Sequence, residues 1–250
     1  MPRRAWMAPL PHANGRMPPV EFTASTPRPR AVLFDLDGTL VDPAGGITRG
    51  IAHGLRSNGL PVPDAATLDS LVGPPLALGL TETVGVPAHL LDDVVRDYRS
   101  WYAAEGMSLS RVYPGMRELL DRLAEASVPV AVATSKPQPI AEALLDRHGL
   151  RSAFASVVGT SADESEAPAA GGSKEHLVRA AAAALGEEPS DVAMVGDREY
   201  DMLAAVATGA LPVGVAWGFA APGELEAAGA VTVVDTADGI LALLTPEVAA

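Results

Sequence analysis

Two carboxylates lie two residues apart at the point where an apolar stretch ends. Residues 31–34 are typical of a buried strand, and Asp35 and Asp37 follow it just before the turn at Gly38 and Thr39. Because side chains alternate along a strand, both carboxylates project to the same side. Like charges this close repel unless a cation or a proton lies between them. The pair therefore suits a bound Mg²⁺ or a nucleophile beside an acid/base, and the backbone N–H groups of Gly38 and Thr39 are expected to bind a phosphate.

Further polar side chains follow later apolar stretches of the chain. Thr134 comes directly after the apolar residues 128–133, and Lys174 opens a predicted helix. Asp197 and Asp201 follow a predicted strand at 191–195, which is apolar after Asp191. Taken singly, each has a structural interpretation, such as a strand-end cap, a solvated helix residue or a charge at a helix N-terminus. Their order, with each group at a strand end or a helix start, favours one shared site.

The apolar pattern that positions these residues alternates between strand and helix after residue 115. Strands without a polar face argue for a parallel sheet covered by helices on both sides, an α/β fold whose ligands bind at the carboxyl ends of the strands. The predicted strands are 31–34, 128–133, 155–158, 191–195, 211–216 and 231–234. The predicted helices are 116–126, 138–148, one from Ser173 to 185, one ending near 208, and a last one capped by Asp238.

A second region contains helical patterns and no strand. It spans residues 45–112 and lies between two breaker clusters, at 42–46 and 113–115. A helical unit on two hinges beside a catalytic strand can exclude water when it closes, so we predict a helical cap domain. The core is then 31–44 with 113–250, and the Pro- and Arg-rich residues 1–30 are predicted to be a disordered tail.

Composition narrows the classes of partner. The chain has 250 residues, a net charge of −13 and no Cys. An acidic surface repels nucleic acid polymers and anionic membranes, although a metal ion and local cations can still attract a phosphorylated small molecule. The absence of Cys excludes disulfides and thiolate chemistry and fits a cytoplasmic location, and the N-terminus shows no secretory signal.

The combined motifs resemble those of the haloacid dehalogenase (HAD)-like hydrolase superfamily. The strings that carry the finer resemblance are Gly-Pro-Pro-Leu at 73–76, Val-Tyr-Pro-Gly at 112–115, Ala-Thr-Ser-Lys-Pro at 133–137 and Val-Gly-Asp-Arg at 195–198. They are similar to the phosphoglycolate phosphatase-like branch, and within it to the 5′-nucleotidase-like group. The resemblance implies a HAD-like Rossmannoid core with an all-helical cap inserted after the first strand.

The same resemblance implies a role for each residue. Asp35 is the nucleophile that forms an aspartyl phosphate, and Asp37 protonates the leaving alcohol and then deprotonates water. Thr134 and Ser135 bind the phosphate, and Lys174 places a cation against the nucleophile and the phosphoryl oxygens. Mg²⁺ is the expected cofactor, and its predicted ligands are the Asp35 carboxylate, the Asp37 carbonyl, Asp197 and Asp201.

We therefore predict a Mg²⁺-dependent phosphomonoester hydrolase acting on a nucleoside 5′-monophosphate or 2-phosphoglycolate. The alternatives are a phosphosugar mutase of the same fold and a non-catalytic phosphate-binding regulator. Residues 73–76 and Arg49 are predicted to select the leaving group, whereas Lys136 is open between a phosphate neighbour and a surface residue. One departure from relatives is the longer acidic segment 162–172 before Lys174, which bears on substrate identity.

Overall fold

A computed structural model describes residues 28–161 and 173–244, and its centre is one six-stranded parallel sheet. The strand order is β5-β4-β1-β6-β7-β8, so the first strand lies in the middle between β4 and β6. The α/β fold and the parallel sheet are thereby confirmed. The strands are β1 (Ala31–Phe34), β4 (Val130–Pro137), β5 (Ser156–Thr160), β6 (Val192–Gly196), β7 (Leu211–Val215) and β8 (Thr232–Val234).

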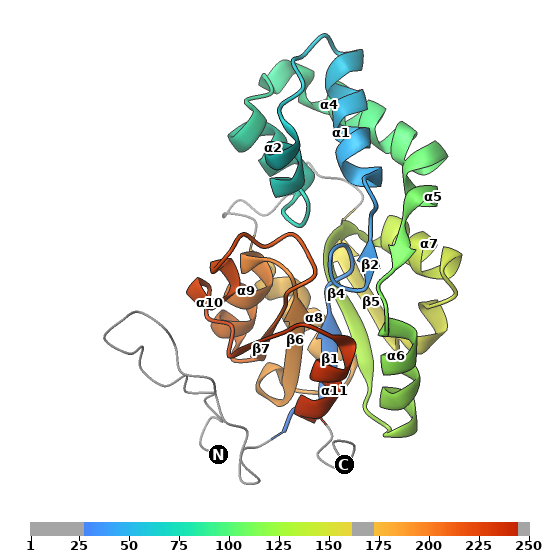
Figure 1. Cartoon of the computed structure of the whole chain (residues 1–250), viewed down its shortest axis with the longest axis vertical. Coiled ribbons are helices and arrows are strands. Elements are labelled where there is room, and N and C mark those ends of the chain that lie inside the picture. The colour runs from blue at the N-terminus through green and yellow to red at the C-terminus, as the bar shows by residue number, and fades with distance from the viewer. Residues whose placement is uncertain (1–27, 162–172, 245–250) are drawn as a thin grey trace.

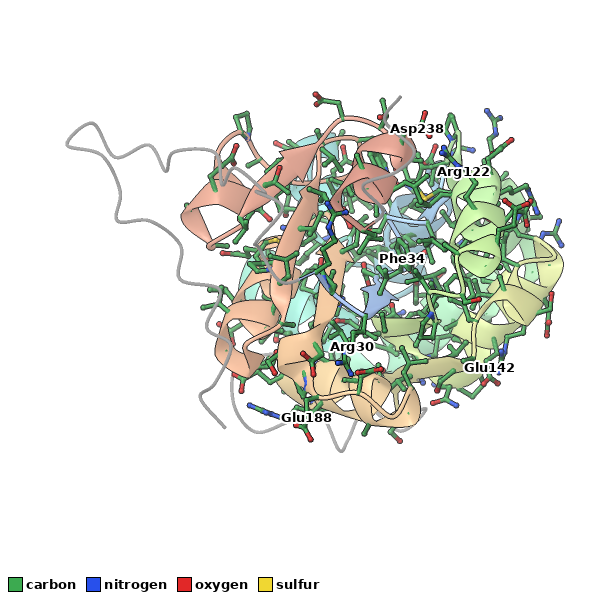
Figure 2. The ribbon with its side chains drawn as sticks, turned by 90° about the horizontal axis from the view of Figure 1, so that it is seen from below. Arg30, Phe34, Arg122, Glu142, Glu188 and Asp238 are labelled. Atoms are coloured by element: carbon green, nitrogen blue, oxygen red, sulfur yellow. The ribbon has the colours of Figure 1, made fainter. Side chains whose placement is uncertain are left out.

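Helices cover both faces of this sheet because its strands are apolar on both sides. Val32 and Phe34 of β1 point into a cluster with α6, α7 and α11, and Ala31 and Leu33 point into a second cluster with α8 and α9. Figure 2 shows Phe34 inside the first layer, and shows Arg122 of α6 near Asp238 of α11, a pair 3.3 Å apart. The helices and short turns of this part are α6 (Met116–Glu125), α7 (Gln138–Arg147), η3 (Arg151–Ala153), α8 (Glu175–Ala184), η5 (Pro189–Asp191), α9 (Glu199–Thr208), α10 (Glu224–Ala227) and α11 (Ala237–Leu244).

The region after β1 is all-helical apart from its two connecting strands, as predicted. We call residues 43–110 the helical insertion. Its own apolar cluster is built around Ile51 and Leu55 of α1 and Val94 of α4. In Figure 1 it stands at one end of the sheet, with α1, α2 and α4 above the core. Its elements are α1 (Gly46–Ser57), α2 (Ala65–Ser70), α3 (Leu76–Leu78), η1 (Gly79–Val84), α4 (Ala88–Trp101), η2 (Tyr102–Gly106) and α5 (Met107–Leu109).

The two connections between the insertion and the core pair with each other. β2 (Val41–Asp42) and β3 (Arg111–Val112) form an antiparallel ribbon in which Val41 lies opposite Val112. The sequence analysis did not predict this ribbon, because two-residue strands carry no periodic signal. The two connections are therefore coupled through antiparallel strand pairing.

Several local expectations need correction. β4 runs on to Pro137, with an irregularity after Ala133, so Thr134 lies within this strand and does not follow it. Helix α8 begins at Glu175 with Lys174 as its N-cap residue. Asp238 does not cap α11: the Thr236 hydroxyl accepts the hydrogen bond from the Gly239 N–H instead, at 3.3 Å.

Two other predicted segments fall largely outside the described residues. They are the N-terminal tail, of which only residues 28–30 are described, and the acidic segment 162–172. Within the described parts of the chain, no helix combines the length and apolar character needed to cross a bilayer.

Candidate active site

The carboxylate pair lies at the carboxyl end of the central strand. The Asp35 N–H donates to the carbonyl of Val195 on β6 over 2.9 Å, which continues the sheet pairing past the end of β1. Asp35 and Asp37 are only 3% and 7% exposed. Burying two carboxylates is costly without cations or donors, so their partners decide what the site can do.

Lys174 links two segments that are distant in the sequence. Its Nζ lies 2.7 Å from Asp35 Oδ1 and 2.7 Å from Asp201 Oδ1, and its side chain is 2% exposed. The second oxygen of Asp201 accepts from the Arg198 N–H at 3.1 Å, which completes the first turn of α9. Lys174 thus lies between the predicted nucleophile and a predicted metal ligand.

Asp197 lies in a pocket that the backbone shapes around its carboxylate. The Thr39 hydroxyl donates to Oδ1 at 3.0 Å, and the Phe219 N–H donates to Oδ2 at 2.9 Å. A Cβ atom at Gly38 or at Gly218 would lie 2.2 Å from the Asp197 side chain, so both positions require glycine. The 217–219 loop is a part of the site that the sequence analysis did not predict.

Burial and like charge shift the protonation of these groups. Burial, together with Asp35 and Asp201, raises the pKa of Asp197 well above its usual range. Burial and Asp35 also raise the pKa of Asp201, to about 6, although Lys174 acts against this. Burial alone would lower the pKa of Lys174, but Asp201 and Asp35 outweigh it and raise that pKa. With all three carboxylates ionised, the cluster would carry more negative charge than Lys174 balances, and this repulsion contributes to the raised pKa values of Asp197 and Asp201.

This imbalance fits a metal ion. Asp35, Asp197 and Asp201 are all buried, and each offers an oxygen within 4.8 Å of the others. Three carboxylates with no nitrogen or sulfur donor suit a hard divalent cation. A bound cation would also relieve the repulsion that raises the pKa of Asp197.

The other carboxylate of the pair has a lysine of its own. Lys136 Nζ lies 2.8 Å from Asp37 Oδ2, and these side chains are 7% and 10% exposed. The same ammonium lies 4.4 Å from the ring centre of Tyr102, which belongs to η2 of the helical insertion. Burial alone would lower the pKa of Lys136, but Asp37 outweighs it and raises that pKa. Of the two possibilities for Lys136 that the sequence left open, the surface position is therefore wrong.

A cavity of about 70 Å³ opens between the core and the helical insertion, above the carboxylate pair. The core contributes Asp35, Asp37 and the end of β4 from Thr134 to Pro137. The insertion contributes Ile47, Leu71, Gly73, Pro74, Leu76, Tyr98, Arg99 and Tyr102. The lining is charged and polar at the core side and mainly apolar and aromatic at the insertion side.

Most of the predicted residues come together in this site. Thr134 lies on the cavity and is 2% exposed, and Ser135 Oγ is a buried cavity-lining atom without a hydrogen-bond partner among the described residues. The amides of Gly38 and Thr39 donate to Val41 and Leu36 within their own loop, so their contact with a phosphate stays a prediction.

The residues predicted to select the leaving group divide into two sets. Gly73, Pro74 and Leu76 line the cavity, whereas Arg49 is not among the lining residues and lies against Gly45. Tyr98, Arg99 and Tyr102 were missed. Helical spacing alone did not show which residues of α4 and η2 face the core.

Arg198 makes a second contact between core and insertion. Its Nη1 donates to the carbonyls of Ser70 and Val72 at the end of α2, and its Nε lies 2.9 Å from Glu224 Oε1. A Cβ atom at Gly73 would lie 2.7 Å from Arg198 Cγ, so the insertion backbone packs closely on this side chain. The loop that carries Asp197 and Asp201 is therefore tied to the insertion.

Comparison with known proteins agrees with this geometry. Residues 29–209 match the family model of haloacid dehalogenase-like hydrolases, so the chain belongs to that family. The 5′-nucleotidase of Pseudomonas aeruginosa is 34% identical over 196 residues, which cover 78% of this chain and 86% of the relative. The phosphoglycolate phosphatase of Agrobacterium fabrum is 32% identical over 201 residues, covering 78% and 84%.

One relative has a different name. The tyrosine-protein kinase PtkA of Mycobacterium tuberculosis is 37% identical over 203 residues, which cover 78% of this chain but 66% of that protein, slightly under two thirds.

Among solved structures, that of a predicted phosphatase from Clostridium acetobutylicum has a TM-score of 0.77 at 34% identity. The match covers 85% of this chain and 96% of that one. The protein is a HAD-like hydrolase with a buried carboxylate cluster suited to a metal ion.

Proposed function

We propose that this protein is a Mg²⁺-dependent phosphomonoesterase that works through an aspartyl phosphate on Asp35. The observation that carries the proposal is the place of Asp35: it lines the cavity and contacts Lys174, and it belongs to the buried carboxylate cluster. A carboxylate that faces a small cavity and is held by a cation is suited to attack an electrophile there.

Each neighbour has a separate task in this proposal. Asp35 attacks phosphorus while Asp37 gives a proton to the leaving alcohol, and Asp37 later takes a proton from the water that hydrolyses the intermediate. Thr134 and Ser135 line the cavity where the phosphoryl oxygens would lie, and Lys174 neutralises charge beside Asp35.

Mg²⁺ is the cation that we propose for the carboxylate cluster. Asp35, Asp197 and Asp201 would hold it with the Asp37 carbonyl, and phosphoryl transfer depends mainly on such charge neutralisation and positioning. Because both Asp201 oxygens already accept hydrogen bonds, from Lys174 and from the Arg198 N–H, we expect Asp201 to bind the metal through water.

The substrate we propose is a small phosphorylated metabolite. A nucleoside 5′-monophosphate is the first choice and 2-phosphoglycolate the second, in line with the names of the two relatives above. We also propose that residues 45–112 form a cap domain on a core of residues 31–44 and 113–250. The cavity-lining residues of the cap domain would then recognise the part of the substrate beyond the phosphate.

Transfer of the phosphoryl group to an acceptor other than water is the second candidate. The insertion side of the cavity is lined mainly by apolar and aromatic residues, which restricts water and would protect an intermediate, as a phosphosugar mutase requires. The name of the relative PtkA, a tyrosine-protein kinase, also describes phosphoryl transfer to an acceptor other than water. A non-catalytic phosphate-binding regulator is disfavoured because Asp35, Lys174, Asp197 and Asp201 form one connected, buried cluster.

The test is phosphate release by the purified chain, with and without Mg²⁺, from a panel of phosphomonoesters. The panel contains nucleoside 5′-monophosphates, 2-phosphoglycolate and sugar phosphates, and Asp35→Asn serves as the matched control. Metal-dependent release that the control abolishes supports the proposal and ranks the substrates. Phosphate exchange between sugar positions without release would favour the mutase, and no reaction with any substrate would overturn the proposal.

A further inference from the structure

We propose that Lys136 is a positioning residue for the second half of the reaction, and that Tyr102 of the helical insertion completes its site. This inference rests on the proposed function, because it concerns how Asp37 acts once the aspartyl phosphate has formed. It assigns a task to a lysine that lies outside the buried carboxylate cluster, and it links that task to the position of the insertion.

The first observation is how the two Asp37 oxygens differ. Oδ2 lies 2.8 Å from Lys136 Nζ. Oδ1 is buried and has no hydrogen-bond partner among the described residues, and Asp37 lines the cavity. Lys136 thus holds one oxygen and leaves the other as the atom that exchanges a proton with a molecule in the cavity. A carboxylate fixed at one oxygen cannot rotate freely, so the direction of Oδ1 is set.

The second observation is the type of contact. An ammonium pairs with an ionised carboxylate, which is the form of Asp37 that accepts a proton from water. In that step the water oxygen attacks phosphorus and its proton passes to Asp37 Oδ1. The bond between phosphorus and Asp35 breaks, and its electron pair returns to the Asp35 carboxylate. The protonated Asp37 then gives that proton to the leaving alcohol of the next turnover, so the cycle balances.

The third observation concerns the other side of the ammonium. The Tyr102 ring lies 4.4 Å from Lys136 Nζ, and Tyr102 is 2% exposed and stacks on Tyr98 with 5.8 Å between ring centres. Tyr102 belongs to the apolar cluster of the insertion, so its ring is in place only when the insertion lies against the core. The cation–π contact therefore makes the position of Lys136 depend on the insertion lying against the core.

The experiment compares Lys136→Met with the wild-type chain, using Mg²⁺ and p-nitrophenyl phosphate. This leaving group needs little help from an acid, so the first half of the reaction is spared. We expect kcat to fall about 10- to 100-fold, part of what acid–base catalysis supplies, while kcat/KM changes less than about 3-fold. A burst of p-nitrophenolate, equal to the enzyme concentration, should precede the slow steady state.

Two variants of Tyr102 test the link to the insertion. Tyr102→Leu removes the ring and should lower kcat about 3-fold with a small burst, whereas Tyr102→Phe keeps the ring and should behave like wild type. If circular dichroism shows that Lys136→Met does not fold, the two Tyr102 variants still test the positioning role of Lys136. Equal behaviour of Tyr102→Leu and Tyr102→Phe would overturn the role of the ring.

Other results would overturn the role of Lys136. A rise in KM with unchanged kcat would make it a substrate-binding residue, and an equal fall of kcat and kcat/KM without a burst would place it in the first step. Unchanged kinetics would remove it from the reaction. Failure of the proposed function is distinguishable from all of these, because the wild-type chain would then release no p-nitrophenolate.

Discussion

The two lysines of the site show how differently the core and the helical insertion contribute. Lys174 lies between Asp35 and Asp201, so all its ionic partners belong to the core. Lys136 lies between Asp37 of the core and Tyr102 of the insertion. Each ammonium is buried, but only the surroundings of Lys136 change if the insertion moves. The core by itself therefore holds the proposed nucleophile and the carboxylate cluster, whereas Lys136, beside the proposed acid/base Asp37, has both partners only when the insertion lies against the core.

Arg198 extends this comparison to the insertion itself. Its side chain reaches from the loop that carries Asp197 to the end of α2, and Figure 1 shows α2 above α9 and α10. The insertion thus contacts the core beside each half of the proposed machinery, at Arg198 for the metal ligands and at Lys136 for the acid/base. Variants on the two sides should therefore fail in different ways.

The largest effect is expected for the nucleophile. Asp35→Asn keeps nearly the same volume but cannot form an aspartyl phosphate, so turnover should fall by at least about 10³-fold. Phosphate release with Mg²⁺ measures this, and thermal unfolding checks that the variant is folded. If the variant retains near-normal, metal-dependent hydrolysis, the core does not act through Asp35.

Lys174→Met tests whether the core cluster is a permanent unit. Removing this ammonium leaves Asp35 and Asp201 buried without their cation, which should cost about 3 kcal/mol of unfolding free energy in a chelator. Mg²⁺ should restore part of that loss, because it neutralises the same carboxylates. Urea unfolding with and without Mg²⁺ measures both values, and Lys136→Met should show less recovery by Mg²⁺. If Mg²⁺ restored the unfolding free energy equally in the two variants, the two lysines would not differ in their relation to the metal site.

Arg198→Met tests the contact between the loop that carries Asp197 and the insertion. It removes donors to the carbonyls of Ser70 and Val72, so we expect kcat/KM to fall about 10-fold, equal to roughly 1.4 kcal/mol. Amide hydrogen exchange in residues 65–73 should become faster. Arg96→Met is the matched control, since the Arg96 side chain on α4 is 64% exposed and pairs with Asp93 and Asp97 of the same helix. Similar exchange in both variants would show that Arg198 does not hold the insertion.

The smallest effect concerns pH and the hinge. His148 lies 2.8 Å from the Ser110 hydroxyl, just before β3, and burial with Arg117 and Arg147 lowers the pKa of His148. A lowered pKa means that the unfolded chain binds the proton more readily, so stability is lost as pH falls below the ordinary value of 6.5. Urea unfolding at about pH 7.5 and 5.5 should show a smaller pH difference for His148→Gln than for wild type. An equal pH difference in unfolding free energy for the two proteins would contradict this role of His148.

Much of the core could be predicted from the sequence because its signals are local. The apolar residues 31–34 and 192–195 form strands of the sheet, and the helical spacing of Ile47, Ile51 and Leu55 marks the buried face of α1. Asp35, Asp197 and Asp201 could be placed together because parallel strands end at one edge of a sheet.

The parts that escaped prediction depend on contacts between segments distant in the sequence. The ribbon of β2 and β3 joins residues about 70 positions apart in the chain, and neither strand is long enough to show a period. Lys136 is followed by a helix start and is indistinguishable in sequence from a surface lysine. Its role becomes visible only when α4 and η2 bring Tyr102 over the core.

The most direct test of the whole account is to identify where the phosphoryl group is carried during turnover. The wild-type chain and Lys136→Met would be mixed with p-nitrophenyl phosphate and Mg²⁺, quenched in acid within one turnover, and digested for mass spectrometry. We expect the phosphoryl group on the peptide that contains Asp35, at higher occupancy in Lys136→Met, and none in Asp35→Asn. A phosphoryl group on another residue, or none in any sample despite turnover, would contradict the account.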